Sequence, residues 1–177
     1  MSATFVNELE KLARTLESEP ASTSSFSLPA LAEKISKNLG VKQDEVAILA
    51  VSTRWRHLHF LVPEALKHVG YIPLSSPVAI AARTVRESRP EIVNNFTETR
   101  HASVFESVKA ESLSSVAIQK MISAPISADG KVVGVIQVSR KGDSPAAAGP
   151  DFTSEDLSRV LSLCKPLGKM LQRLCPE

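Results

Sequence analysis

The residues best suited to binding chemistry begin at Ser75 and Ser76, which precede Pro77 and a run of small apolar residues. A capping serine followed by a proline in the first turn is a common helix start. Unpaired backbone N–H groups at such an end attract anions, and Arg83, one to two turns further along, would add a charged donor. The pattern predicts either an anion-binding helix end or an ordinary capped helix with nothing bound.

Three further candidates follow in a stretch without clear periodicity. Asn94 and His101 bring hydrogen-bonding side chains, and Phe105 brings an apolar one. Histidine titrates near neutral pH and could contact a ligand, although a histidine in a surface loop would leave the same pattern. The candidate ligand-binding residues are therefore Ser75, Ser76, Arg83, Asn94, His101 and Phe105.

A histidine pair also has a spacing that could hold a metal ion. His57 and His59 alternate along an expected strand, so they share one side of it. No further ligand has a fixed direction, because Glu64 and His68 lie beyond Pro63. We expect a strand side that faces water and no metal site.

Both cysteines, Cys164 and Cys175, lie in the last segment of the chain. A helix there would hold them about 16 Å apart along its axis, which is too far for a disulfide. Buried side chains in a reducing compartment are the simpler interpretation, and a redox-active thiol would require exposure.

Composition is consistent with one self-sufficient domain. A chain of 177 residues with 43% hydrophobic residues can form a core of its own. The net charge of +2 is spread over 21 basic and 19 acidic residues without a run of like charges, so nucleic acid is not an expected partner. No apolar stretch approaches the roughly 20 residues of a membrane span. We therefore expect a cytoplasmic protein that does not bind a membrane.

Residues 123–142 read as a hairpin with a fully buried second strand. Asp129-Gly130 supplies the positive backbone dihedrals of a tight turn, and an apolar run follows at once from Val132 to Val138. A strand that is apolar on both sides needs cover above and below the sheet, which predicts an α+β domain. An earlier hairpin is expected from the apolar run Val46–Val51 and the alternating residues 57–62. The long crossover between the two hairpins, residues 63–120, is the expected place for a binding site.

Amphipathic helices are expected at both ends. Phe5, Leu9, Leu12 and Leu16 follow a heptad-like spacing, and a small-residue linker separates them from the rest. We divide the chain into a helix at 1–20, a linker at 21–27 and a domain at 28–177. The last helix, capped by Thr153 or Ser154, has an apolar stripe wider than one partner would cover. The first helix has no evident core to enter, so the two helices predict a homodimer built from the chain's ends.

The order of these parts resembles the GAF domain family, over residues 28–174. The motifs that carry the resemblance, in chain order, are Ile72-Pro73-Leu74, the helical stretch 79–89, Pro90-Glu91-Ile92-Val93-Asn94, Ser123-Ala124-Pro125-Ile126, Gly134-Val135-Ile136-Gln137-Val138 and Asp151-Phe152-Thr153. The resemblance implies a six-stranded antiparallel sheet, with the terminal helices on one face and a pocket, lined by the helix after Ser76, on the other.

The chemistries of known GAF relatives can be compared with the residues present. Members that bind cyclic nucleotides carry an Asn-Lys-Phe-Asp-Glu set, of which only Asn94 and Phe96 occur here in order. Bilin-binding members attach the chromophore through a cysteine, and the methionine sulfoxide reductases of the family use loop cysteines. Both cysteines here lie in the terminal helix, so neither chemistry has its nucleophile.

The resemblance favours a non-catalytic sensory module that binds a small molecule or anion and signals through a homodimer to a separate partner protein. One alternative is a structural dimer without a ligand. A second is a small enzyme that uses the crossover cavity, with His101 as general base and Arg83 or Arg100 as anion holder. The sequence identifies neither a cofactor nor the ligand.

Overall fold

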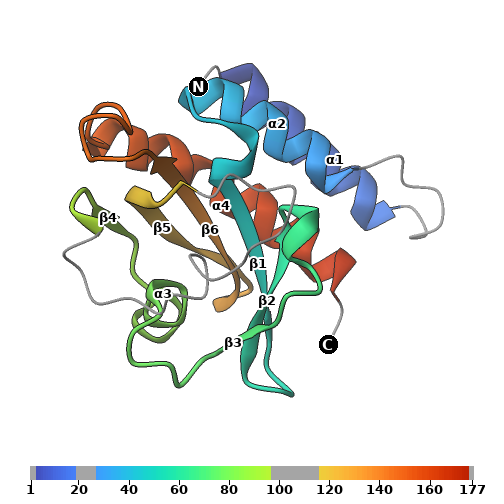
Figure 1. Cartoon of the computed structure of the whole chain (residues 1–177). Coiled ribbons are helices and arrows are strands. Elements are labelled where there is room, and N and C mark those ends of the chain that lie inside the picture. The colour runs from blue at the N-terminus through green and yellow to red at the C-terminus, as the bar shows by residue number, and fades with distance from the viewer. Residues whose placement is uncertain (1–2, 19–26, 97–115, 176–177) are drawn as a thin grey trace.

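A six-stranded antiparallel sheet forms the centre of the computed structural model, which describes residues 3–18, 27–96 and 116–175 (Figure 1). The strand order is β3-β2-β1-β6-β5-β4. The strands are β1 (Val46–Ser52), β2 (His57–Val62), β3 (Tyr71–Pro73), β4 (Glu91–Val93), β5 (Ile118–Ala128) and β6 (Lys131–Lys141). The predicted α+β class and the six-stranded antiparallel sheet are confirmed.

The hairpin of β5 and β6 is the longest pairing in the sheet. Its turn has Asp129 at φ 49° and Gly130 at φ 76°, the left-handed pair that a two-residue turn requires. Strand β6 lies between β1 and β5, and residues 134–139 are buried on both of its sides. The expected central strand is therefore confirmed, although β5 begins at Ile118, five residues before the predicted hairpin.

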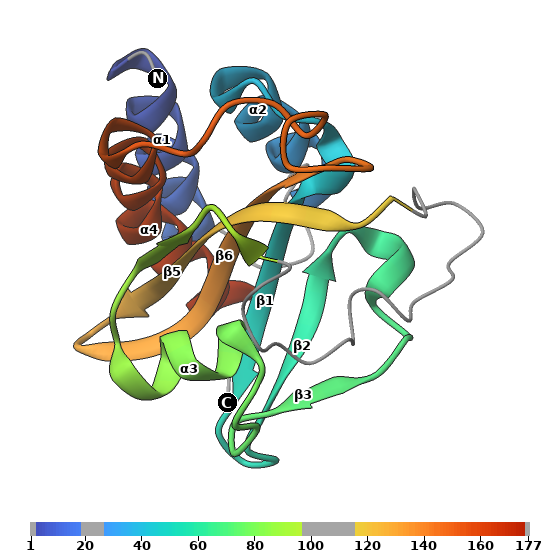
Figure 2. The same ribbon diagram turned by 60° about the vertical axis from the view of Figure 1, so that its left-hand side comes forward.

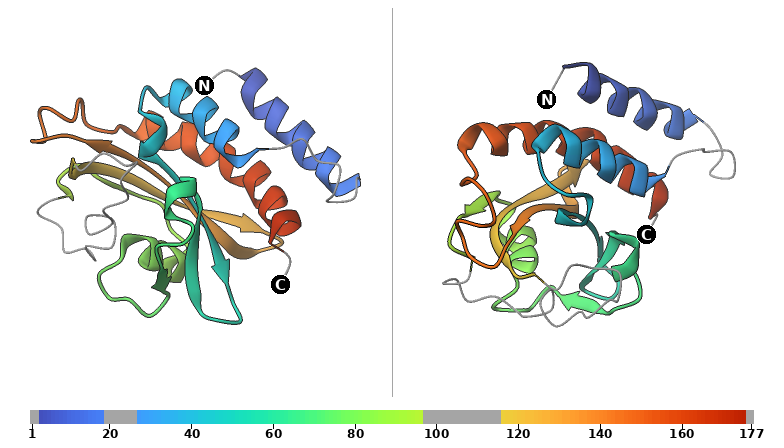
Figure 3. Two further views of the ribbon diagram at one scale, coloured as in Figure 1. Left: turned by 45° about the vertical axis from the view of Figure 1, so that its right-hand side comes forward. Right: turned by 45° about the horizontal axis from the view of Figure 1, so that its top comes forward.

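Three helices cover one face of the sheet, which we call the three-helix face (Figure 3). They are α1 (Ala3–Ser18), α2 (Leu28–Leu39) and α4 (Ser154–Leu174). Alternate residues of β5 and β6, including Ile122 and Ile136, pack there against Ile35, Leu163 and Leu167 in one apolar cluster. Helix α4 lies so close to β5 that a Cβ on Gly168 would overlap the Ser127 carbonyl oxygen.

The opposite face carries the short helix α3 (Ile80–Glu87) and is called the α3 face (Figure 2). Leu49, Leu58 and Phe60 point to this side and pack with Ala81 and Ala82 of the helix. Two one-turn 3₁₀ helices, Gln43–Glu45 and Glu64–Leu66, connect the remaining elements. None of the helices among the described residues has the length and apolar character needed to cross a membrane.

The first helix differs from its predicted role, because it packs within its own chain. Helices α1 and α4 lie in contact, and Phe5 is buried in the same cluster as Val160 and Leu163. The expectation that α1 has no core to enter is therefore wrong. The wide stripe of α4 explains the difference, since the sheet covers one part of it and α1 covers another. Leu161 and Leu174 are the large apolar side chains of α4 that remain exposed.

Candidate functional site

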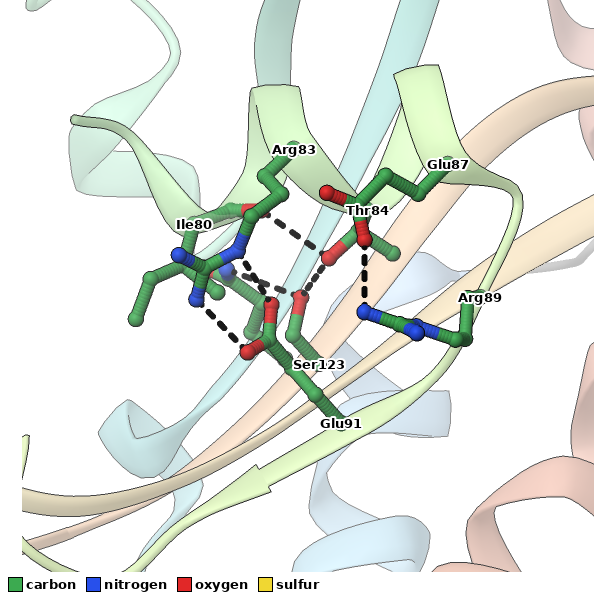
Figure 4. Close-up of polar contacts among 8 residues, drawn as sticks. Ile80, Arg83, Thr84, Glu87, Arg89, Glu91 and Ser123 are labelled. Carbon is green, nitrogen blue, oxygen red and sulfur yellow. Dashed lines mark hydrogen bonds and ion pairs between the residues drawn. The ribbon is translucent and has the colours of Figure 1, made fainter. Parts of the chain in front are cut away.

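Three polar side chains are buried on the α3 face, and we call them the polar cluster: Thr84, Ser123 and Gln137. Figure 4 shows Thr84 and Ser123 side by side. They come from α3, β5 and β6, which the fold brings together. Gln137 points to the α3 face because its neighbours Ile136 and Val138 pack on the opposite one. Their exposed fractions are 1%, 0% and 2%, so water does not satisfy these groups from the surface.

The polar cluster forms a chain of hydrogen bonds with one direction. Thr84 Oγ1 donates to the Ile80 carbonyl oxygen at 2.9 Å and lies 2.7 Å from Ser123 Oγ. Because the Thr84 proton is engaged, the Ser123 hydroxyl donates to Thr84 and in turn accepts from Gln137 Nε2 at 3.2 Å. Gln137 is the first donor in this series of hydrogen bonds. Its own Oε1 is buried, and no described residue donates to it. This oxygen is therefore suited to accept a hydrogen bond from a bound group.

Arg83 does not stand free at this face. Its Nε and Nη2 bind the two carboxylate oxygens of Glu91 at 3.1 and 2.6 Å, which ties α3 to β4 (Figure 4). The hydrogen bonds that Arg83 donates to the Glu91 carboxylate raise the pKa of Arg83 above its ordinary value. The pair is half-buried and locally neutral. Arg83 therefore positions α3, and its charge is already balanced.

The helix expected to start at Ser76 and Pro77 starts later. Helix α3 begins at Ile80, with Ala79 as its N-cap residue. Ser76 Oγ accepts a hydrogen bond from the Ala79 backbone N–H at 3.1 Å, so one of the donors expected to face an anion is already used. Ser75 is exposed in the preceding turn. The prediction of the helix start was wrong because the serine closes a turn before the helix and does not cap its first turn.

Asn94 connects two distant segments. Its Nδ2 donates to the Phe152 carbonyl oxygen at 3.0 Å, and its Oδ1 accepts from the Phe152 backbone N–H at 2.8 Å. Both ends of the amide are thus engaged by the chain just before α4. His101 and Phe105 lie outside the described residues, as does Arg100.

The histidine pair and the thiols lie away from the polar cluster. His57 and His59 share one side of β2, with ring centroids 6.1 Å apart. The described residues contain no group of three or more potential metal ligands. Both cysteines are free, and burial raises the pKa of Cys164 to about 12 and that of Cys175 to a smaller extent. Neither thiol is activated as a nucleophile.

Sequence reasoning did not select Thr84, Ser123 or Gln137. A signal was present, since Ser123 and Gln137 each stand between two apolar neighbours within a strand. A buried strand that carries a glutamine needs a partner for it, and the register pairs Ser123 with Gln137 across β5 and β6.

Comparison with known families and structures agrees with this architecture. The family model for the GAF domain matches residues 27–170. The chain belongs to the GAF domain family. No protein of curated function matches the sequence significantly.

Solved structures similar to this GAF domain come from sensory and enzymatic proteins. The GAF domain from an Acinetobacter phosphoenolpyruvate-protein phosphotransferase has a TM-score of 0.65 at 17% identity, with 97% of this chain and 94% of that one covered. Free methionine-R-sulfoxide reductase from Neisseria meningitidis has a TM-score of 0.61 at 18% identity, over 98% and 93%. The GAF domain of a two-component sensor histidine kinase from Bacillus halodurans has a TM-score of 0.58 at 15% identity, over 85% and 97%. At these identities the likeness concerns the fold.

Proposed function

We propose that this GAF domain is a non-catalytic, cytoplasmic sensory module that binds a small molecule on the α3 face of its sheet. The observation that carries the proposal is the buried Gln137 Oε1, which has no donor among the described residues. A buried carbonyl oxygen without a hydrogen bond costs about 1–3 kcal/mol, so a bound group that donates to it gains that amount. The polar cluster holds Gln137 in place and leaves this acceptor available.

The same geometry limits the chemical class of the proposed ligand. A hydrogen-bond donor, an N–H or O–H group, is required opposite Gln137 Oε1. Arg83 is paired with Glu91, which favours a neutral donor group over the anion that the sequence suggested at this helix. Thr84 and Ser123 act through Gln137, because their own hydrogen bonds are engaged.

A non-catalytic role is supported by the thiols. The chain has two cysteines, both in or directly after α4, and the pKa of Cys164 is raised to about 12. One of the similar structures is a free methionine-R-sulfoxide reductase, so that activity is the appropriate enzymatic comparison. We expect no turnover of free methionine-R-sulfoxide by this chain. Reduction of the sulfoxide by purified protein would overturn the non-catalytic assignment.

Signalling through a homodimer remains part of the proposal. Leu161, a large apolar side chain of α4 that stays exposed, supports a second copy packing against this helix. Leu161→Glu should then yield monomers in sedimentation. Leu174→Glu, at an exposed position nearer the end of the same helix, is the matched control. A wild-type monomer, or a dimer that survives Leu161→Glu, would contradict this part.

The test of ligand binding is native mass spectrometry of the purified chain beside Gln137→Met. Methionine keeps the length of the side chain and removes the acceptor. Gln119→Met is the matched control, because Gln119 is also buried, has an unpaired oxygen and binds the Gly142 carbonyl away from the polar cluster. We expect a small-molecule adduct on wild type and Gln119→Met and little on Gln137→Met. Equal adducts on all three, or none on wild type, would overturn the proposal.

A further inference from the structure

The chain's one tryptophan and one tyrosine lie together on its surface. Trp55, in the turn between β1 and β2, is 67% exposed, and Tyr71 on β3 is 64% exposed. With Ser52, His57 and His59 they line a hollow of about 560 Å³, which we call the aromatic hollow. Exposed apolar surface that is gathered in one place marks interaction sites more often than scattered residues do.

The aromatic hollow is separate from the polar cluster. Leu58, Phe60 and Ile72 point into the apolar cluster of the α3 face. Because side chains alternate along strands, His57, His59 and Tyr71 point to the other side, the three-helix face. The hollow therefore offers a second site, independent of the ligand proposed at Gln137.

Ring contacts connect three of the residues that line the hollow, His57, His59 and Tyr71. The His57 ring lies 4.2 Å from the Tyr71 ring at a tilt of 35°, and it meets His59 edge-on. Burial lowers the pKa of His59, with a smaller contribution from His57, so the His59 ring is neutral at neutral pH. Rings that are already ordered lose little conformational freedom when a partner binds.

The shape of the hollow favours a large partner. Small-molecule sites enclose most of their ligand, whereas this hollow is open to water. An open hollow suits one side chain of a larger molecule whose surrounding surface covers the rim. Tryptophan, tyrosine and arginine are also the residues that dominate binding energy at protein interfaces.

The charge around the hollow indicates the kind of partner. The Arg54 guanidinium lies 5.0 Å from the centre of the Trp55 ring, and Arg56 is exposed in the same turn. The five lining residues include no carboxylate. A second copy of the chain packed about a two-fold axis through this patch would bring arginine against arginine, which is unfavourable.

We propose that the aromatic hollow docks an acidic segment of a partner protein. One apolar side chain of that segment inserts between Trp55 and Tyr71, and flanking carboxylates pair with Arg54 and Arg56.

The single tryptophan makes the proposal directly measurable, because all indole emission reports on Trp55. The full chain is titrated with synthetic peptides of eight residues, in which glutamates flank one central Leu, Ile or Phe. We expect a saturable change in emission that weakens by about tenfold or more when salt is raised to about 0.5 M. Peptides with lysine in place of glutamate should give no change.

Variants separate the charged contact of the two arginines from the apolar contact of the aromatic rings. Arg54→Glu with Arg56→Glu should weaken binding by about tenfold or more, whereas Lys165→Glu with Lys169→Glu, an equal charge change on α4, should not. Tyr71→Ala keeps the reporter and removes one wall, so binding should weaken by a similar factor. Absence of any emission change with all three peptides would overturn the proposal. Peptide binding that Arg54→Glu with Arg56→Glu leaves unchanged would overturn it too. A wild-type dimer that Tyr71→Ala dissociates would also overturn it, since the occupant of the hollow would then be a second copy.

Discussion

The two faces of the central sheet are built from the same strands and filled in different ways. On the three-helix face, Ile122 and Ile136 belong to one apolar cluster with residues of α1, α2 and α4. On the α3 face, the neighbouring positions Ser123 and Gln137 carry a hydrogen-bond chain with one acceptor left over. The three-helix face therefore holds the larger apolar cluster, whereas the α3 face also buries the hydrogen-bonding groups at which we propose that a ligand binds.

The largest expected effect concerns the three-helix face. Leu163→Ala removes a side chain with no exposed area from α4 and leaves a cavity against the sheet. We expect a loss of about 2–5 kcal/mol in the free energy of unfolding, measured by urea titration. Leu174→Ala, at an exposed position of the same helix, should cost far less. Equal losses would contradict the assignment of the core to this face.

A second change tests how closely α4 and the sheet approach. A methyl group on Gly168 would overlap the Ser127 carbonyl oxygen, so the helix must shift away from β5. Gly168→Ala should therefore lose about 1–3 kcal/mol, although alanine normally favours helices over glycine. Ser162→Ala, on the exposed side of α4, is the control. A gain in stability in Gly168→Ala would show that the approach is looser than described.

A change in the polar cluster should affect stability much less. Gln137→Met loses one hydrogen bond to Ser123 but also removes a buried oxygen without a donor. These terms nearly cancel, so we expect a change within about 1 kcal/mol in the free energy of unfolding of the ligand-free chain. A loss as large as that of Leu163→Ala, seen in the same urea titration, would mean that Gln137 serves the core.

The smallest effect concerns reactivity and leaves stability at neutral pH unchanged. The pKa of Cys164, raised by burial from 9.0 to about 12, keeps its thiol protonated in the folded chain at pH 8. Cys175 is half-buried, so iodoacetamide should label it first, and Cys164 should react only after unfolding. Peptide mass spectrometry distinguishes the two cysteines. Equal labelling rates of the two cysteines would show that the Cys164 thiol on the three-helix face is accessible to water.

The same raised pKa makes stability depend on pH. As pH rises, the Cys164 thiol ionises in the unfolded chain before it ionises in the folded chain, so the free energy of unfolding falls between pH 9 and about 12.

Much of the fold followed from local patterns in the sequence. The Asp129-Gly130 turn and the apolar run after it predicted the central strand, because backbone dihedrals and burial on both sides leave local marks. The packing of α1 against α4 could not be predicted from such local patterns. A wide apolar stripe on α4 fits a second copy and a helix of the same chain equally well, and only the three-dimensional arrangement decides between them.

The sequence did not reveal the polar cluster, for a physical reason. The structure pairs Arg83 with Glu91 and Asn94 with Phe152, and these tertiary contacts cannot be read from local spacing. Ser76 was expected to cap a helix, and it closes a turn three residues earlier. Predicting the polar cluster would have required the register of β5 with β6, which places Ser123 beside Gln137.

Hydrogen exchange on two preparations of one protein tests the central claim most directly. One sample is studied as purified, and the other is unfolded in urea, dialysed and refolded so that any bound molecule is lost. The account predicts slower exchange in the purified sample for α3 and for the β5 and β6 segments around Ser123 and Gln137, with α2 and α4 unchanged. Identical exchange in the two samples, or a difference confined to the three-helix face, would contradict it.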